Sequence, residues 1–131
     1  MFSDAAVLNL LTDVNTLLDS LLIGIVVQES RGDAIVELHF KARVSSKFSE
    51  VHIRFTDVLE FEFYYESDER FFDVEDLKFL ELKDGTFYLS LDPDPSTLLE
   101  AGATELDASD TDHFFVHARH IEATTVAKPA P

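Results

Sequence analysis

Residues 4–19 show the hydrophobic spacing of an amphipathic helix. Apolar side chains recur at three- and four-residue spacing, and polar side chains occupy the positions between them. Ser3 is a suitable N-cap, and Asp4 would lie at the positive end of the helix dipole. The pattern therefore predicts a single helix over residues 4–19. Its apolar stripe consists of Val7, Leu10, Leu11, Val14, Leu17 and Leu18.

From Ile25 onward, apolar residues alternate with polar ones, which is the period of a strand that buries one face. Arg31-Gly32-Asp33 and Asp84-Gly85 have the composition of tight hairpin turns between such strands. The alternation predicts strands at residues 25–29, 34–43, 51–55, 59–65, 77–82, 87–91 and 113–126.

Sequential strands joined by short polar turns predict an α+β fold. In it, the N-terminal amphipathic helix packs on or plugs a mostly antiparallel, strongly curved β-sheet, either a meander or a small barrel. A barrel can hold a ligand, whereas a helix-covered sheet usually cannot. We expect a single domain over residues 1–127 and a frayed tail at 128–131. The aromatic residues that would line a barrel are Phe55, Phe61, Phe63, Phe87 and Phe114.

The composition narrows the functional classes. The chain has 131 residues, no cysteine and a formal net charge of −16, which argues against binding nucleic acid or anionic membranes. The absence of cysteine excludes disulfides, thiolate nucleophiles and thiolate metal sites. The first residues lack the basic stretch of a secretory signal, and no apolar run approaches the ~20 residues of a membrane span. We therefore expect a cytoplasmic protein.

The negative charge is concentrated in one part of the chain. Residues 55–118 contain 18 acidic and three basic side chains, whereas residues 31–54 contain five basic and three acidic ones. This asymmetry indicates either an electronegative interaction surface or a solvated face that keeps the protein soluble. A halophilic origin is a further explanation of the acidity.

Two patterns resemble metal sites and fail on closer inspection. His113, His117 and His120 would share a face only on a helix, and their flanking residues favour a strand. Asp92 and Asp94 resemble the first ligands of a calcium loop, but the later glycine and glutamate of that loop are missing. We expect no metal and no cofactor. The chain also lacks a glycine-rich phosphate loop and a nucleophile elbow, so the sequence favours a protein without enzymatic activity.

Three segments, at residues 51–58, 85–93 and 110–122, resemble small acidic bacterial proteins. The resemblance lies in an aromatic-Leu-Ser-Leu-Asp-Pro strand end and in an Asp-x-Phe-x-x-x-Ala-basic-x-Ile last strand. Some of these proteins accompany toxins as immunity proteins. The resemblance carries no catalytic motif and bears mainly on the fold.

Our first hypothesis is a non-enzymatic, acidic protein-interaction domain, with an immunity-type inhibitor of a basic partner such as a nuclease toxin as its most specific form. Tyr65 is a further aromatic anchor in this hypothesis. The candidate interaction residues are Asp57, Glu60, Glu62, Tyr64, Glu66, Asp68, Glu69, Tyr88, Asp92 and Asp94.

Two alternatives remain open at this point. One is a small-ligand-binding, β-barrel-like protein or minor enzyme with an aromatic-lined interior. The other is a structural domain that forms homo-oligomers through an edge strand or through the leucine-rich helix.

Overall fold

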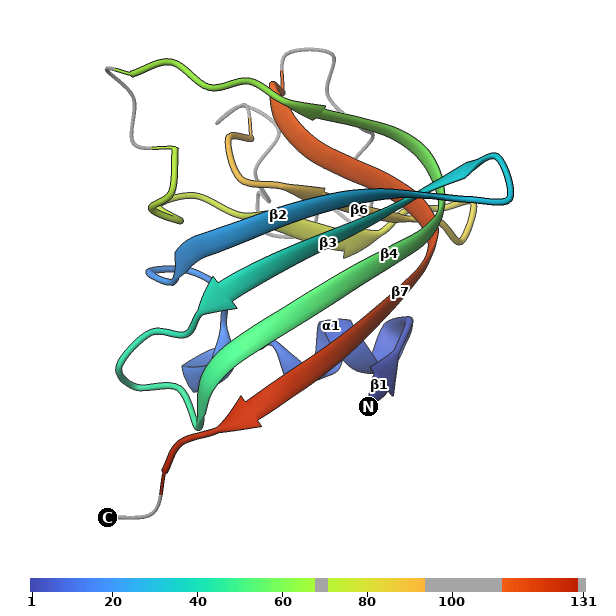
Figure 1. Cartoon of the computed structure of the whole chain (residues 1–131). Coiled ribbons are helices and arrows are strands. Elements are labelled where there is room, and N and C mark those ends of the chain that lie inside the picture. The colour runs from blue at the N-terminus through green and yellow to red at the C-terminus, as the bar shows by residue number, and fades with distance from the viewer. Residues whose placement is uncertain (68–70, 94–111, 130–131) are drawn as a thin grey trace.

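The computed structural model describes residues 1–67, 71–93 and 112–129. Within these ranges the chain forms one antiparallel sheet of seven strands, one α-helix and one 3-10 helix (Figure 1). The elements are, in chain order, β1 (Phe2–Ser3), α1 (Ala5–Leu10), the 3-10 helix (Asp13–Asn15), β2 (Leu21–Ser30), β3 (Asp33–Lys41), β4 (Phe48–Phe63), β5 (Lys78–Glu81), β6 (Phe87–Ser90) and β7 (Phe114–Ala127).

The last strand of the chain lies in the middle of the sheet. The strand order is β2-β3-β4-β7-β6-β5, and β1 also pairs with β7. The long β7 pairs with β4 along most of its length, and on its other side it pairs with β6 and then with β1. The sheet is therefore mostly antiparallel, as predicted, but it is not a simple meander.

β4 is one continuous strand that bends sharply. The sequence predicts separate strands at 51–55 and 59–65, and this prediction is wrong. Asp57 adopts a left-handed conformation with φ 50°, and the pairing register with β7 shifts between Val58 and Glu60. Such an irregularity bends a strand without ending it. Figure 1 shows β4 and β7 curving together at this point.

The sheet is not closed, so the small-barrel alternative is wrong. At one end of β2, Leu21 forms an isolated bridge with Asp73, and the Leu22 N–H donates to the carbonyl of Phe72 at 2.8 Å. This short connection links the start of β2 to the segment that precedes β5. The rest of β2 has no second neighbouring strand among the described residues.

The hydrophobic core lies on the face of the sheet that the period-two pattern predicts. Alternate residues of β3, β4 and β7 are buried there, together with Val7 of α1 and Leu17. Because α1 contributes Val7, it packs against this core. The fully buried residues on the sheet include Val36, Leu38, Phe40, Val51, Ile53, Phe55, Ile121 and Ala123.

The prediction of one helix over residues 4–19 is wrong. The α-helix spans Ala5–Leu10 only, and the N-cap position belongs to Asp4 instead of Ser3. Asp13 and Asp19 have φ values of 52° and 64°, which interrupt a right-handed helix. Asp4 is also held by β7, because its backbone N–H donates to the carbonyl of Ile121 and its carboxylate accepts the N–H of Ile121.

The hairpin between β2 and β3 supplies a stability prediction. Its two-residue turn places Arg31 at φ 53° and Gly32 at φ 86°. Asparagine adopts this left-handed conformation more readily than arginine, so Arg31→Asn should stabilise the fold by about 0.5–1 kcal/mol. Urea denaturation of the wild type and the variant measures the difference. Arg31→Lys, which keeps both the charge and the left-handed penalty, should leave stability unchanged.

Candidate interaction surface

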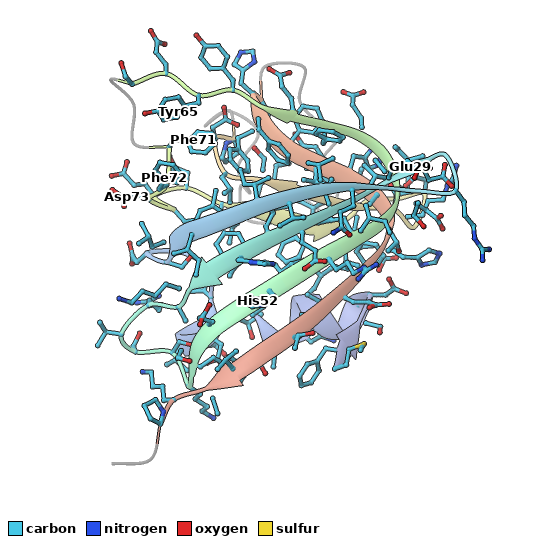
Figure 2. All side chains as sticks on the ribbon, in the orientation of Figure 1. Glu29, His52, Tyr65, Phe71, Phe72 and Asp73 are labelled. Carbon is cyan, nitrogen blue, oxygen red and sulfur yellow. The ribbon has the colours of Figure 1, made fainter. Side chains whose placement is uncertain are left out.

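The end of β4 and the residues that follow it form a surface with aromatic and acidic side chains. Glu60 and Glu62 lie near the end of β4, and Tyr64, Tyr65 and Glu66 follow this strand directly. All five side chains are exposed. Phe72 lies next to Tyr65, with ring centroids 6.3 Å apart. We call this set the rim: Glu60, Glu62, Tyr64, Tyr65, Glu66 and Phe72. Figure 2 shows Tyr65 and Phe72 close to each other beside Phe71.

Two exposed rings of the rim, Tyr65 and Phe72, rest on the half-buried ring of Phe71. Phe71 contacts both Tyr65 and Phe72 edge-on, with centroid distances of 5.3 and 5.0 Å. Phe71 in turn lies 5.1 Å from Phe114, which is 4% exposed, and Phe63 contacts Phe114 at 4.9 Å. Rings supported in this way lose less conformational entropy on binding than free side chains would.

The three aromatic side chains of the rim are each about half exposed to solvent. Tyr64 is 52% exposed, Tyr65 57% and Phe72 49%. Tyr65 and Phe72 are neighbours, and exposed aromatic residues that lie together commonly mark an interaction site. Sequence reasoning named Tyr64 and Tyr65 but missed Phe72. The available signal was the Phe71-Phe72 pair within an otherwise acidic segment.

The acidic side chains of the rim are partly held by their neighbours. Glu62 accepts a hydrogen bond from His113 at 3.1 Å, and the hydroxyl of Tyr64 donates to Glu66 at 3.4 Å. The backbone N–H of Tyr64 also donates to the carbonyl of His113, which ties the end of β4 to the start of β7. Glu62 is thus held by His113 and Glu66 by Tyr64, whereas Tyr65 and Phe72 contact Phe71.

The remaining predicted interaction residues do not all lie on the rim. Asp57 lies at the bend of β4, 3.7 Å from Nε2 of His120, and lines an open pocket together with Arg31. Tyr88 is fully buried, so the expectation of an exposed anchor is not met there. Its hydroxyl donates to Asp112, and its ring lies 5.4 Å from Nζ of Lys78. Asp68, Glu69 and Asp94 lie outside the described residues.

Asp92 joins β6 to the start of β7. Its carboxylate accepts the backbone N–H groups of His113 and Phe114, both at 2.9 Å. Burial raises the pKa of this carboxyl above 3.8, and the two backbone N–H groups oppose that shift. Its bonds to β7 give Asp92 a structural role whether or not it also contacts a partner.

The polar chain formed by His117, Thr86 and Asp84 resembles a catalytic triad in its residue types only. The Thr86 hydroxyl donates to Asp84 at 2.5 Å and lies 2.7 Å from Nε2 of His117. In a hydrolase triad the imidazole stands between the carboxylate and the hydroxyl, so that it can remove the hydroxyl proton. Here the hydroxyl stands in the middle and gives its hydrogen bond to the carboxylate. The arrangement stabilises the turn before β6 and does not activate a nucleophile.

The Asp84 carboxylate supplies a prediction about pH. The hydrogen bond from the Thr86 hydroxyl lowers the pKa of Asp84 below 3.8 in the folded state. Its contribution to stability is therefore present above about pH 3.8 and is lost as the pH falls through the lower, folded-state pKa. Denaturation of the wild type and Asp84→Asn across this range should show a difference that disappears in acid. In Thr86→Val the pKa of Asp84, measured by NMR, should rise.

Histidine placement on the sheet agrees with the strand prediction. His113 lies just before β7, and His117 and His120 lie on it, where they do not converge. On β3 and β4, His39 and His52 stack at 4.1 Å, and each contacts a glutamate two residues before it. No group of three or more potential metal ligands occurs within residues 1–67, 71–93 and 112–129.

Two open pockets are lined by charged residues, and the second of them also by Ala34 and Ile35. One, of about 210 Å³, lies between Asp19, Asp73 and Glu75, and the other, of about 270 Å³, lies beside Arg31 and Asp57. Neither is lined by aromatic residues. Phe55, Phe87 and Phe114, which a barrel would have directed toward a ligand, are packed in the core at 0–4% exposure.

No protein-family model, curated protein or solved structure matches this chain. In the part of the chain that the structure describes, neither helix has the length and apolar character needed to cross a membrane.

Proposed function

We propose that this chain is a non-enzymatic interaction domain that binds a positively charged protein through the rim. The observation that carries the proposal is the pair of exposed rings, Tyr65 and Phe72, on the half-buried ring of Phe71, in a segment that also exposes the carboxylates of Glu60, Glu62 and Glu66. Aromatic side chains are frequent energetic anchors of protein interfaces. Carboxylates around them exclude acidic partners and favour basic ones.

The charge of the whole chain also favours a basic partner. A net charge of −16, concentrated in residues 55–118, produces a field that raises the association rate of a basic protein. The same charge opposes self-association, because two copies would bring together like-charged surfaces. A basic partner is therefore a better candidate than a second copy of the chain.

The more specific proposal is an immunity-type inhibitor, and its support is the resemblance of residues 51–58, 85–93 and 110–122 to small acidic bacterial proteins. Enzymes that cut nucleic acid present basic surfaces to the phosphate backbone. An acidic rim would compete with nucleic acid for such a surface. Co-expression with the captured partner tests this form, because an inhibitor should restore the growth of cells that the partner harms.

Capture from a lysate of the source organism tests the interaction itself. The immobilised chain should retain a protein of basic isoelectric point at low salt and release it as the salt concentration rises. The rim-neutral variant, Glu60→Gln/Glu62→Gln/Glu66→Gln, should retain much less of the same protein.

A matched control removes the same number of charges elsewhere. Asp13→Asn/Asp33→Asn/Glu81→Gln changes exposed acids on the 3-10 helix, β3 and β5, and it should capture the partner as the wild type does. Equal losses in both variants would mean that total charge, and not the rim, determines binding. Retention of neutral or acidic proteins alone would reject the proposal.

A further inference from the structure

Along residues 23–29, the outer edge of β2 has no backbone partner among the described residues, and its pairing with β3 is irregular only between Leu22 and Gly24. β2 pairs with β3 on one side, and Figure 1 shows it as the last strand on that side of the sheet. On its other side, described partners occur only at Leu21 and Leu22. Natural edge strands are commonly protected by lysine, proline or a covering segment. Residues 23–28 contain neither a charged residue nor proline.

The hairpin geometry identifies the backbone groups at this edge. Ser30 and Asp33 pair across the two-residue turn, so alternate residues of β2 bond to β3 from that point onward. Ile25, Val27 and Glu29 occupy the positions between them and direct their N–H and C=O groups away from β3. No described residue bonds to these groups.

The side chains along the edge leave apolar surface uncovered. Ile25 and Val27 face the core side of the sheet, since their partners on β3 are the buried residues Leu38 and Val36. Val27 is nevertheless 49% exposed, since no strand among the described residues lies beyond it, and Ile23, at the register shift, is equally exposed. An additional strand would cover this apolar surface and pair with the free backbone groups at the same time.

The net negative charge of the chain favours a positively charged occupant at the edge of β2. Asp73 lies at one end of the edge and Glu29 at the other, as Figure 2 shows, and Tyr65 and Phe72 of the rim lie near Asp73. The basic side chains close to β2 are Arg31, at the tip of the hairpin, and Lys41, which pairs with Leu21 from the β3 side. A second copy of a chain with a net charge of −16 fits this edge poorly, whereas a segment with basic side chains fits it well.

We propose that the free edge of β2 receives an extended segment of the positively charged partner, which adds a strand to the sheet. Backbone hydrogen bonds to Ile25, Val27 and Glu29 supply part of the affinity, and basic side chains alternating with apolar ones supply the selectivity. This inference rests on the proposed function, since it assigns to the same partner a mode of binding next to the rim.

Amide hydrogen exchange, followed by NMR on the full chain, tests the proposal with a defined probe. The probe is a peptide of about eight residues in which lysine and valine alternate, a length that matches a typical strand. At saturation it should slow the exchange of the Ile25, Val27 and Glu29 amides at least about tenfold. The amides of Val26 and Gln28, which the pairing pattern directs to β3, should change little. A peptide of alternating glutamate and valine should have no effect.

Two variants of one position separate the edge from the fold. Val27→Pro removes the N–H that faces outward, at a place where the strand has no partner to lose, and should weaken peptide binding at least about tenfold. Val27→Ala keeps the N–H and should retain most of the binding. Circular dichroism on both variants checks that the sheet is intact. If Val27→Pro unfolds and Val27→Ala does not, amide hydrogen exchange of the wild type with the peptide remains the test of the added strand.

The remaining outcomes distinguish this inference from the proposed function. If millimolar peptide does not protect the amides of Ile25, Val27 and Glu29, the inference is overturned. It is also overturned if the peptide changes the NMR signals of the rim residues only. Rim-dependent capture of a basic protein without protection of these amides leaves the proposed function standing and overturns the added strand. Protection that rises with the concentration of the chain alone identifies a second copy as the occupant and also overturns it. Protection by the peptide, with capture from lysate insensitive to the rim, supports the edge and rejects the rim.

Discussion

Replacing Tyr65 and Phe72 together by serine should weaken binding of the basic partner by about 100-fold, because aromatic anchors at the centre of an interface each contribute on the order of 1–2 kcal/mol. Both side chains are about half exposed and are supported from below by Phe71. Their removal therefore takes away contact area with the partner while the core stays packed. The loss should appear mainly as faster dissociation.

Surface plasmon resonance with the captured partner measures this change, and a second double variant controls for general loss of apolar surface. Val14 and Val44 are exposed apolar residues outside the rim, at 46% and 94% exposure. Val14→Ser/Val44→Ser should bind as tightly as the wild type. If both double variants bind equally well, the aromatic part of the rim is not an anchor.

Phe55→Ala should destabilise the fold by about 3–5 kcal/mol, the usual cost of removing a fully buried phenylalanine ring. Phe55 is 0% exposed and stands at the centre of the sheet, paired with Val36 on β3 and Ile121 on β7. The cavity would lie where β4 contacts the strands on both sides, so little relaxation is available. This is the largest stability effect that we expect from a single substitution.

Chemical denaturation measures the effect, with Phe61→Ala on the same strand as the control. Phe61 is 37% exposed, so its truncation should cost about 1 kcal/mol or less. Similar losses for the two variants would contradict the placement of the core on one face of the first half of β4.

Strand positions were predictable because β3 and the first half of β4 bury alternate residues, and because the Asp84-Gly85 turn marks the start of β6. The stretches at 34–43, 87–91 and 113–126 correspond to β3, β6 and β7 to within a few residues. The insertion of β7 between β4 and β6 was not predictable in this way. Pairing between strands distant in sequence depends on matching lengths and curvature, and the hydrophobic period records neither.

The N-terminal helix shows where the pattern misleads. Val7, Leu11 and Leu17 are buried as the helical stripe predicts, but they reach the core from a short helix and from the irregular backbone after it. Asp13 and Asp19 tolerate the left-handed conformation that interrupts the helix. The spacing of apolar residues thus identified three of the buried side chains, but Val14 and Leu18 of the predicted stripe are exposed because the backbone is not α-helical there.

The rim was partly predictable from composition. Glutamate and phenylalanine alternate over residues 60–63, and this pattern placed Glu60, Glu62 and Tyr64 on the exposed face of the strand. Tyr65 falls on the same face as Phe61 and Phe63 in that pattern, yet it is exposed. The sequence also predicted an exposed position for Tyr88, but Tyr88 is buried and its hydroxyl donates to Asp112. Only the three-dimensional structure reveals that both faces of β6 are covered.

The rate at which the partner associates, measured by stopped flow at increasing ionic strength, tests the central claim most directly. For the wild type the rate should fall at least about tenfold between low and high salt, as expected for electrostatically steered association. Glu60→Gln/Glu62→Gln/Glu66→Gln should associate more slowly at low salt and depend less on salt, whereas the matched control should resemble the wild type. Identical rates for the two variants, or a wild-type rate that does not change with salt, would contradict binding of a basic protein at the rim.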